Sequence, residues 1–119
     1  MAEVLVVEDD KDLVYIYQTA LAHAGHHVET ALSGQQARTV LEDFTPDVVF
    51  LDMNMPNGNG IEVIDYIRSQ ERLRDTRIVV VTANQLWQQE IPRDDIELFL
   101  VKPVRIQDLI RLAERLTRR

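Results

Sequence analysis

The sequence predicts an α/β fold: a doubly wound, five-stranded parallel sheet with helices on both faces. Four strands are predicted from apolar segments at residues 4–7, 48–51, 78–81 and 98–101, and a short strand at roughly residues 27–31 completes the set. Apolar runs that are continuous rather than alternating are typical of strands buried on both faces of a parallel sheet. Between these runs apolar residues recur with helical spacing, so strands and helices alternate along the chain. This alternation is typical of β-α-β units and hence of a parallel sheet.

Each helix is predicted from apolar residues spaced i, i+3, i+4 and i+7 and from residues that begin or end helices. Gly25 ends the first helix, and Pro46 lies just past the end of the second. Ser33 or Gly34 begins the second helix, and Gly60 begins the third. The five predicted helices cover residues 13–24, 34–44, 60–67, 85–91 and 106–116.

The fourth helix is the shortest of the five. Asn84 can cap its first turn, because an Asn side chain accepts a hydrogen bond from a backbone N–H at a helix start. Pro92 limits this helix to about two turns, since proline lacks a backbone donor and disfavours helix at the residue before it. Asp94 and Asp95 then predict a turn before the last strand.

The strand order follows from the connections. Right-handed crossovers and short loops favour the order 2-1-3-4-5, which is that of a flavodoxin-like sheet. In such a sheet ligands bind beyond the carboxyl ends of the strands, where the order reverses between the first and third strands. A functional site is therefore expected at that edge.

Composition narrows the classes of function. The chain has 119 residues, of which 45% are hydrophobic, so it can form one domain with a substantial core. Its apolar runs fall well short of the ~20 residues that a membrane span needs. The net charge of −7 argues against a nucleic-acid surface covering the domain. We therefore expect a cytoplasmic protein with no direct nucleic-acid or membrane partner.

Four of the predicted strands end on side chains that suit phosphoryl transfer with a divalent cation. The residues at these ends are Glu8 with Asp9 and Asp10, Asp52, Thr82 and Lys102. Neighbouring strands lie ~4.8 Å apart, so the acids that follow the first and third strands are expected to be adjacent. Two carboxylates ~5 Å apart repel by roughly 3 kcal/mol at an effective dielectric constant near 20. Mg²⁺ would relieve this repulsion, because it prefers oxygen ligands and leaves positions for phosphate.

Asp52 is the expected nucleophile, because it lies centrally among these groups. A carboxylate can attack a phosphoryl group and form an aspartyl phosphate. Such a transfer mainly needs positioning and neutralisation of the phosphoryl oxygens. We expect Mg²⁺, the Lys102 ammonium and the Thr82 hydroxyl to contact those oxygens. Each residue alone has a common structural explanation, but the four together in this order favour a site.

The chain also resembles a known family, the response-regulator receiver domains of two-component systems, which include the chemotaxis regulators. The resemblance extends over essentially the whole chain, and we expect one receiver domain at residues 1–119. Its landmarks are Val6-Val7-Glu8-Asp9-Asp10, Leu51-Asp52-Met53-Asn54-Met55-Pro56 with Gly60, Val81-Thr82-Ala83, and Val101-Lys102-Pro103.

The resemblance implies a phosphorylation-dependent signalling switch. Asp52 would receive a phosphoryl group from a sensor histidine kinase or a phosphotransfer protein. Glu8 and Asp9 would form the acidic pair of a Mg²⁺ site, in which Asp9 and Asp52 ligate the ion. The backbone carbonyl of Asn54 would add a third ligand. The domain would catalyse only its own phosphorylation and dephosphorylation, so it is not expected to be a turnover enzyme.

The resemblance also implies how the switch works. Thr82 would be the switch hydroxyl and Phe99 the switch aromatic, so that phosphorylation alters the surface of the fourth helix, the last strand and the last helix. The Lys102-Pro103 peptide bond is expected to be cis. The family usually has a Gly-Ala pair before the last strand, but this chain has Arg93-Asp94-Asp95-Ile96-Glu97, so this output surface is expected to differ.

Two further features belong to the expected site and its surroundings. Asn57-Gly58-Asn59-Gly60 predicts a turn over the site. Trp87, the only tryptophan, is interpreted as a half-buried packing residue in preference to a partner contact. The cognate kinase and the downstream protein target cannot be read from the sequence.

Two alternative functions use the same residues. One is a Mg²⁺-dependent phosphatase with an aspartyl nucleophile, of the haloacid-dehalogenase type. That family has a second Asp two positions after the nucleophile, where this chain has Asn54, and usually a cap domain, for which there is no room. The other is a receiver-fold binding module that is not phosphorylated. The presence of Asp52, Thr82 and Lys102 together argues against it.

Overall fold

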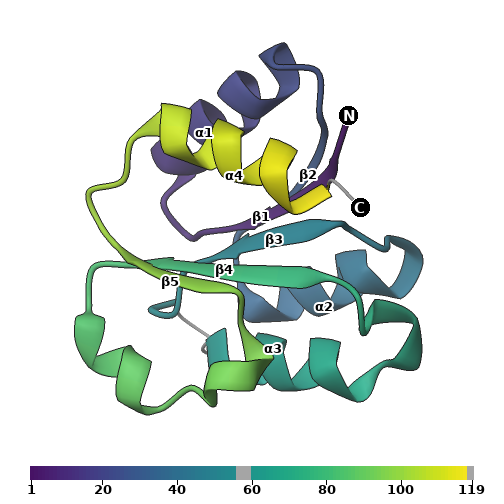
Figure 1. Ribbon diagram of the computed structural model, residues 1–119, viewed down its shortest axis with the longest axis vertical. Helices are drawn as coiled ribbons and strands as arrows, with labels where there is room; N and C mark the ends of the chain where they lie inside the picture. Colours follow the sequence, from purple (N-terminus) through teal and green to yellow (C-terminus); the bar gives the residue numbers. More distant parts are fainter. Residues whose placement is uncertain (56–59, 118–119) are drawn as a thin grey trace.

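The computed structural model describes residues 1–55 and 60–117 and contains one five-stranded sheet, ordered β2-β1-β3-β4-β5 (Figure 1). All neighbouring strands run parallel. The strands are β1 (Glu3–Val7), β2 (His27–Ala31), β3 (Val48–Leu51), β4 (Arg77–Thr82) and β5 (Leu98–Val101). The predicted fold class and strand order are confirmed.

Helices cover both faces of the sheet. Figure 1 shows α1 and α4 on one side of the sheet and α2 and α3 on the other. These helices are α1 (Lys11–His23), α2 (Gly34–Asp43), α3 (Gly60–Ser69) and α4 (Ile106–Thr117). Asp10 caps α1 and Ser33 caps α2, because each side chain accepts hydrogen bonds from backbone N–H groups of the first turn.

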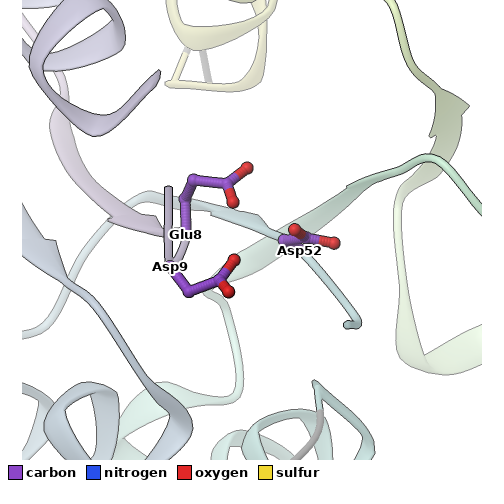
Figure 2. Close-up of side chains that lie close together, drawn as sticks. All are labelled: Glu8, Asp9 and Asp52. Carbon is purple, nitrogen blue, oxygen red and sulfur yellow. The ribbon is translucent and has the colours of Figure 1, made fainter. Parts of the chain in front are cut away.

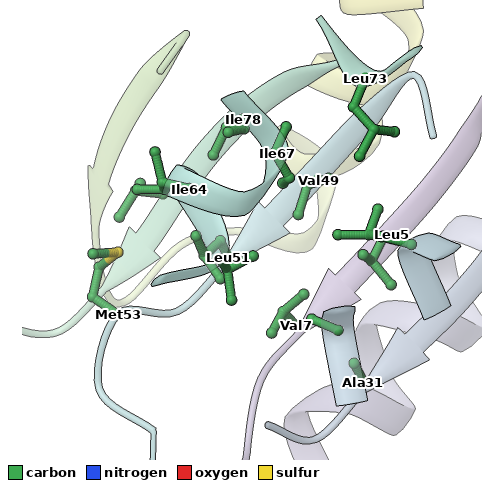
Figure 3. Close-up of a cluster of buried hydrophobic side chains, with 14 of the residues drawn as sticks. Leu5, Val7, Ala31, Val49, Leu51, Met53, Ile64, Ile67, Leu73 and Ile78 are labelled. Atoms are coloured by element: carbon green, nitrogen blue, oxygen red, sulfur yellow. The ribbon is translucent and has the colours of Figure 1, made fainter. Parts of the chain in front are cut away.

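Both faces of the central strands are buried, which explains their continuous apolar sequences. In β1, Leu5 and Val7 belong to one buried cluster, whereas Val4 and Val6 belong to another on the opposite face. Figure 3 shows the first cluster, in which the strands pack against Ile64 and other side chains of α3. Burial of each such side chain stabilises the fold by about 1.5–3 kcal/mol.

The expected α-helix at residues 85–91 is absent, and that prediction was wrong. The segment instead contains a short 3₁₀-helix, η2 (Gln85–Gln89), and a second one, η3 (Arg93–Asp95), follows at the predicted turn. Asn84 does cap η2, because its Oδ1 accepts a hydrogen bond from the backbone N–H of Leu86 at 3.0 Å. Pro92, which has no backbone donor, separates the two turns. A 3₁₀-helix rises about 2.0 Å per residue, so it spans this short connection with fewer residues than an α-helix.

Arg68 of α3 anchors the connection between β4 and β5 to the rest of the fold. Its guanidinium donates hydrogen bonds to the carbonyl oxygens of Asp95 and Thr76, both at 2.9 Å, and of Arg74 at 3.2 Å. Arg74 and Thr76 follow a third 3₁₀-helix, η1 (Glu71–Leu73). One side chain therefore joins η3 to α3 and to the turn before β4.

Gly60 begins α3, as predicted, at a point where the backbone comes close to Met53. A Cβ at position 60 would lie 2.5 Å from Met53 Sδ and 3.0 Å from Met53 Cα, so only glycine fits without displacement. The rest of the predicted turn at Asn57-Gly58-Asn59, like Pro56, lies outside the described residues. Within the described residues, no helix combines the length and the apolar character needed to cross a membrane.

Candidate metal centre

Three acidic side chains meet at the carboxyl ends of β1 and β3. Glu8 and Asp9 directly follow β1, and Asp52 directly follows β3, its neighbour in the sheet. The N–H of Asp52 donates to the carbonyl of Val7 at 3.0 Å, which fixes the two strand ends side by side. Carboxylate oxygens of the three acids lie within 4.8 Å of one another. Figure 2 shows the carboxylates of Glu8 and Asp9 on the side facing Asp52.

Two of these acids are shielded from water, and one is not. Glu8 is 3% exposed and Asp52 is 7% exposed, whereas Asp9 is an exposed residue. The pKa of Glu8 is raised from 4.5 to about 7, chiefly because of burial; the hydrogen bond with Lys102 partly opposes this effect, and the charge of Asp52 adds to it. A buried cluster of this kind accommodates full negative charge only when a cation is close by.

Lys102 supplies one such cation. Its Nζ lies 2.5 Å from Oε1 of Glu8 and 3.4 Å from Oδ2 of Asp52. Burial alone would lower the pKa of Lys102, but the hydrogen bond with Glu8 and the charge of Asp52 raise it overall. The backbone N–H of Lys102 donates to the backbone carbonyl of Thr82 at 2.9 Å. The Lys102-Pro103 peptide bond is cis. The end of β5 thus brings the ammonium to the acid cluster.

Thr82 and Phe99 lie on the two strands beyond Asp52. Thr82 ends β4, which pairs with β3, and it is completely buried. Its Oγ1 accepts a hydrogen bond from the N–H of Asn84 at 3.5 Å. Phe99 of β5 pairs in register with Val80 and packs, partly buried, against the core cluster beneath α3. Parallel pairing therefore brings Thr82 to the same edge of the sheet as Asp52.

Asn54 makes two hydrogen bonds, neither of which the sequence predicted. Its N–H donates to Oδ1 of Asp52 at 3.2 Å, in the loop that follows β3. Its side-chain Oδ1 accepts a hydrogen bond from Nε1 of Trp87, 33 residues away in η2, at 2.8 Å. Trp87 is half-buried and packs against the core, as expected, but no sequence pattern indicated its contact with the site.

The donor atoms at this edge suit a hard divalent cation. Among the described residues, Glu8, Asp9 and Asp52 are the one group of three or more acids and histidines whose ligand atoms lie close enough to share an ion. All three offer carboxylate oxygens, the ligand type that Mg²⁺ prefers, and no thiolate or imidazole takes part. The residues therefore fit Mg²⁺.

Comparison with known proteins decides the family. The family model for the response regulator receiver domain matches residues 4–114. The chain belongs to the response regulator receiver domain family. The resemblance seen in the sequence is thereby confirmed, and this receiver domain is a component of two-component signalling.

Three relatives show how far the similarity extends. Response regulator ArlR of Staphylococcus aureus is 28% identical over 121 residues, which include 100% of this chain and 54% of ArlR. The receiver domain thus spans about half the length of that relative. Response regulator TrrA of Thermotoga maritima, solved in complex with Mg²⁺-BeF, is 26% identical with a TM-score of 0.85, over 98% of this chain and 99% of that chain.

The third relative was solved with a metal ion. It is the receiver domain of sensor histidine kinase PA1611 of Pseudomonas aeruginosa PAO1, with magnesium coordinated in its active-site cleft. It is 28% identical, with a TM-score of 0.84, over 96% of this chain and 95% of that chain. The fold of the receiver domain described here is therefore shared with proteins solved in the presence of Mg²⁺.

Proposed function

We propose that this receiver domain is a phosphorylation-dependent switch in which Asp52 accepts a phosphoryl group from a sensor histidine kinase or a phosphotransfer protein. The observation that carries the proposal is the convergence of a buried carboxylate, two further acids and an ammonium at one edge of the sheet. A nucleophile, a cation site and a positive charge for phosphoryl oxygens are the components that such a transfer needs. We assign all of residues 1–119 to this domain.

In the proposed transfer, a carboxylate oxygen of Asp52 bonds to phosphorus. The bond between phosphorus and the donor's histidine nitrogen breaks, and the imidazole leaves with the electron pair. Mg²⁺ held by Asp9, Asp52 and the backbone carbonyl of Asn54, with Glu8 completing the acidic pair, would neutralise charge on the phosphoryl group. Lys102 binds a second phosphoryl oxygen, for which its Nζ is already 3.4 Å from Asp52.

The proposed response begins at Thr82. A phosphoryl group on Asp52 attracts the Thr82 hydroxyl through a charge-assisted hydrogen bond, and Phe99 then turns toward the space that Thr82 leaves. The side chain of Phe99 lines an open pocket of about 700 Å³ together with Ile91 and Ile96. The affected surface comprises η2, η3, β5 and α4, since this chain has two 3₁₀-helices where a fourth α-helix was expected.

Intact-mass spectrometry tests the proposal. The protein is incubated with Mg²⁺ and acetyl phosphate, with parallel samples that contain EDTA or the Asp52→Asn variant. We expect a single phosphoryl adduct that needs Mg²⁺ and that is absent from the variant. Repeated turnover of phosphate esters would favour the phosphatase instead, and absence of both the adduct and metal binding would favour the binding module.

A further inference from the structure

Trp87 reaches the phosphorylation site through Asn54, although neither residue carries out the transfer itself. The indole Nε1–H of Trp87 donates to Asn54 Oδ1 at 2.8 Å, and the backbone N–H of Asn54 donates to Asp52 Oδ1 at 3.2 Å. Two hydrogen bonds therefore connect the 3₁₀-helix η2 with the phosphoacceptor. Trp87 also packs against the core cluster beneath α3, which helps to fix its position.

The contact fixes the orientation of the Asn54 amide. An indole N–H can only donate, and the amide has a single accepting atom, so Oδ1 of Asn54 must face Trp87. The Asn54 side chain is otherwise exposed, two residues from Asp52. Without Trp87, the amide could rotate and turn its Oδ1 toward a water molecule beside the acceptor carboxylate.

Hydrolysis of an aspartyl phosphate depends on such a water. The water oxygen bonds to phosphorus, the bond between phosphorus and the Asp52 oxygen breaks, and the carboxylate leaves with the electron pair. The water's proton passes to solvent, and inorganic phosphate is released. An acceptor that takes a hydrogen bond from the attacking water orients it and speeds this step.

We propose that Trp87 is a positioning residue that lengthens the lifetime of phosphorylated Asp52, because its hydrogen bond directs the Asn54 oxygen toward η2 and not toward the attacking water. This inference rests on the proposed function. It concerns only the loss of the phosphoryl group, not its transfer to Asp52. The hydrogen bond between Trp87 and Asn54 thus links η2, part of the proposed output surface, to the lifetime of the phosphoryl group on Asp52.

Substitution of Trp87 by Phe tests the inference, because Phe keeps an aromatic ring and lacks the N–H donor. The protein is phosphorylated with acetyl phosphate and Mg²⁺, the donor is removed, and decay of the adduct is followed by intact mass. Loss of one hydrogen bond of ordinary strength predicts a decay rate higher by roughly threefold to tenfold. Leu86→Ala, a change at an exposed neighbour in η2, is the matched control and should decay like the wild type.

A double-mutant cycle with Asn54→Ala separates positioning from a general structural effect. Alanine keeps the backbone carbonyl at position 54 but removes the side-chain oxygen. If Trp87 acts through that oxygen, Trp87→Phe will not change the decay rate in the Asn54→Ala protein. Trp87→Leu, which also lacks the donor, is a second variant, and thermal unfolding of each protein shows whether it is folded.

Two results would overturn the inference: equal decay of the wild type and both Trp87 variants, or an equal acceleration by Trp87→Phe in the presence and absence of the Asn54 side chain. A wild-type protein that forms no adduct would refute the proposed function and, with it, this inference. The two failures are distinguishable, because the second appears before any decay is measured.

Discussion

At the scale of single residues, Lys102 balances the charge of the two buried acids. Its Nζ contacts both Glu8 and Asp52, at 2.5 Å and 3.4 Å. Removal of one partner of a buried charge pair is costly, because the remaining charge has no compensation. The ammonium therefore has two roles: it stabilises the metal-free site, and we propose that it binds a phosphoryl oxygen during transfer.

Lys102→Ala is expected to lower the rate of phosphorylation by roughly a hundredfold, the usual effect of losing one charge-stabilising group in a transition state. The rate is measured by intact mass, with acetyl phosphate and Mg²⁺. Lys11→Ala is the matched control, because Lys11 is the only other lysine and is exposed at the start of α1. Equal rates in the wild type and the Lys102 variant would contradict the role given to Lys102.

Glu8 gives metal binding a pH dependence near neutrality. Burial raises its pKa from an ordinary 4.5 to about 7, so below that pH the folded protein keeps a proton on the acid cluster. Proton and metal compete for the cluster, so we expect the Mg²⁺ affinity to rise roughly tenfold between about pH 6 and about pH 8. Isothermal titration calorimetry measures this affinity.

Glu8→Gln is the control for this prediction, since glutamine does not titrate, and its Mg²⁺ affinity should depend less on pH. The same shift acts on the metal-free fold. A raised carboxyl pKa stabilises the folded state below 4.5, and this contribution is lost as the pH rises through about 7. An identical pH dependence of Mg²⁺ binding in both proteins would argue against the role of Glu8.

At the scale of elements, the connection between β4 and β5 lacks the α-helix that each of the other three connections between consecutive strands contains. It consists of η2 and η3, which few backbone hydrogen bonds stabilise internally. Its position is set instead by side chains: Asn84 caps η2, and Arg68 binds the carbonyl of Asp95 in η3. Because this segment belongs to the proposed output surface, its anchoring bears on signalling.

Arg68→Ala is expected to lower the free energy of unfolding by about 1–3 kcal/mol, because three carbonyl groups lose a charged donor. Urea denaturation measures the change. Arg111→Ala, an exposed arginine on α4, should change it by less than about 0.5 kcal/mol. Equal stability of the two variants would show that Arg68 does not anchor η3.

At the scale of the whole molecule, the sheet is the scaffold that carries the site. Buried clusters on its two faces hold β1, β3 and β4 in register, and register places Asp52 beside the end of β1. The site residues therefore depend on core packing, although they take little part in it. A core change should affect the stability of the entire domain in one transition.

Leu51→Ala tests this dependence, because Leu51 is fully buried and directly precedes Asp52. We expect the free energy of unfolding to fall by about 2–5 kcal/mol, with a single transition by both circular dichroism and Trp87 fluorescence. Ile106→Ala, at a side chain that is 37% exposed, is the control and should cost much less. Separate transitions by the two probes would contradict a single cooperative unit.

Much of this arrangement could be predicted because it follows from local patterns and one topological rule. Continuous apolar runs indicate buried parallel strands, and parallel strands bring their carboxyl ends to one edge. The convergence of Glu8, Asp52 and Lys102 could therefore be expected from residues that are up to 94 positions apart. The functional roles of these residues remain proposals.

Two features could not be predicted, for physical reasons. The choice between an α-helix and 3₁₀-helices at residues 85–91 depends on the distance to be spanned and on anchors such as Arg68, neither of which leaves a periodic signal. The hydrogen bond between Trp87 and Asn54 joins two exposed or half-exposed side chains across 33 residues, and single polar contacts of this kind have no sequence pattern.

A crystal structure with Mg²⁺ and beryllofluoride would test the central claim most directly, since this pair of ligands mimics the metal and the phosphoryl group. We predict beryllium bonded to a carboxylate oxygen of Asp52, the ion in contact with Asp9, Asp52 and the Asn54 carbonyl, and Lys102 Nζ bound to a fluoride. Beryllofluoride on another side chain, or the ion bound away from Asp52, would contradict the account.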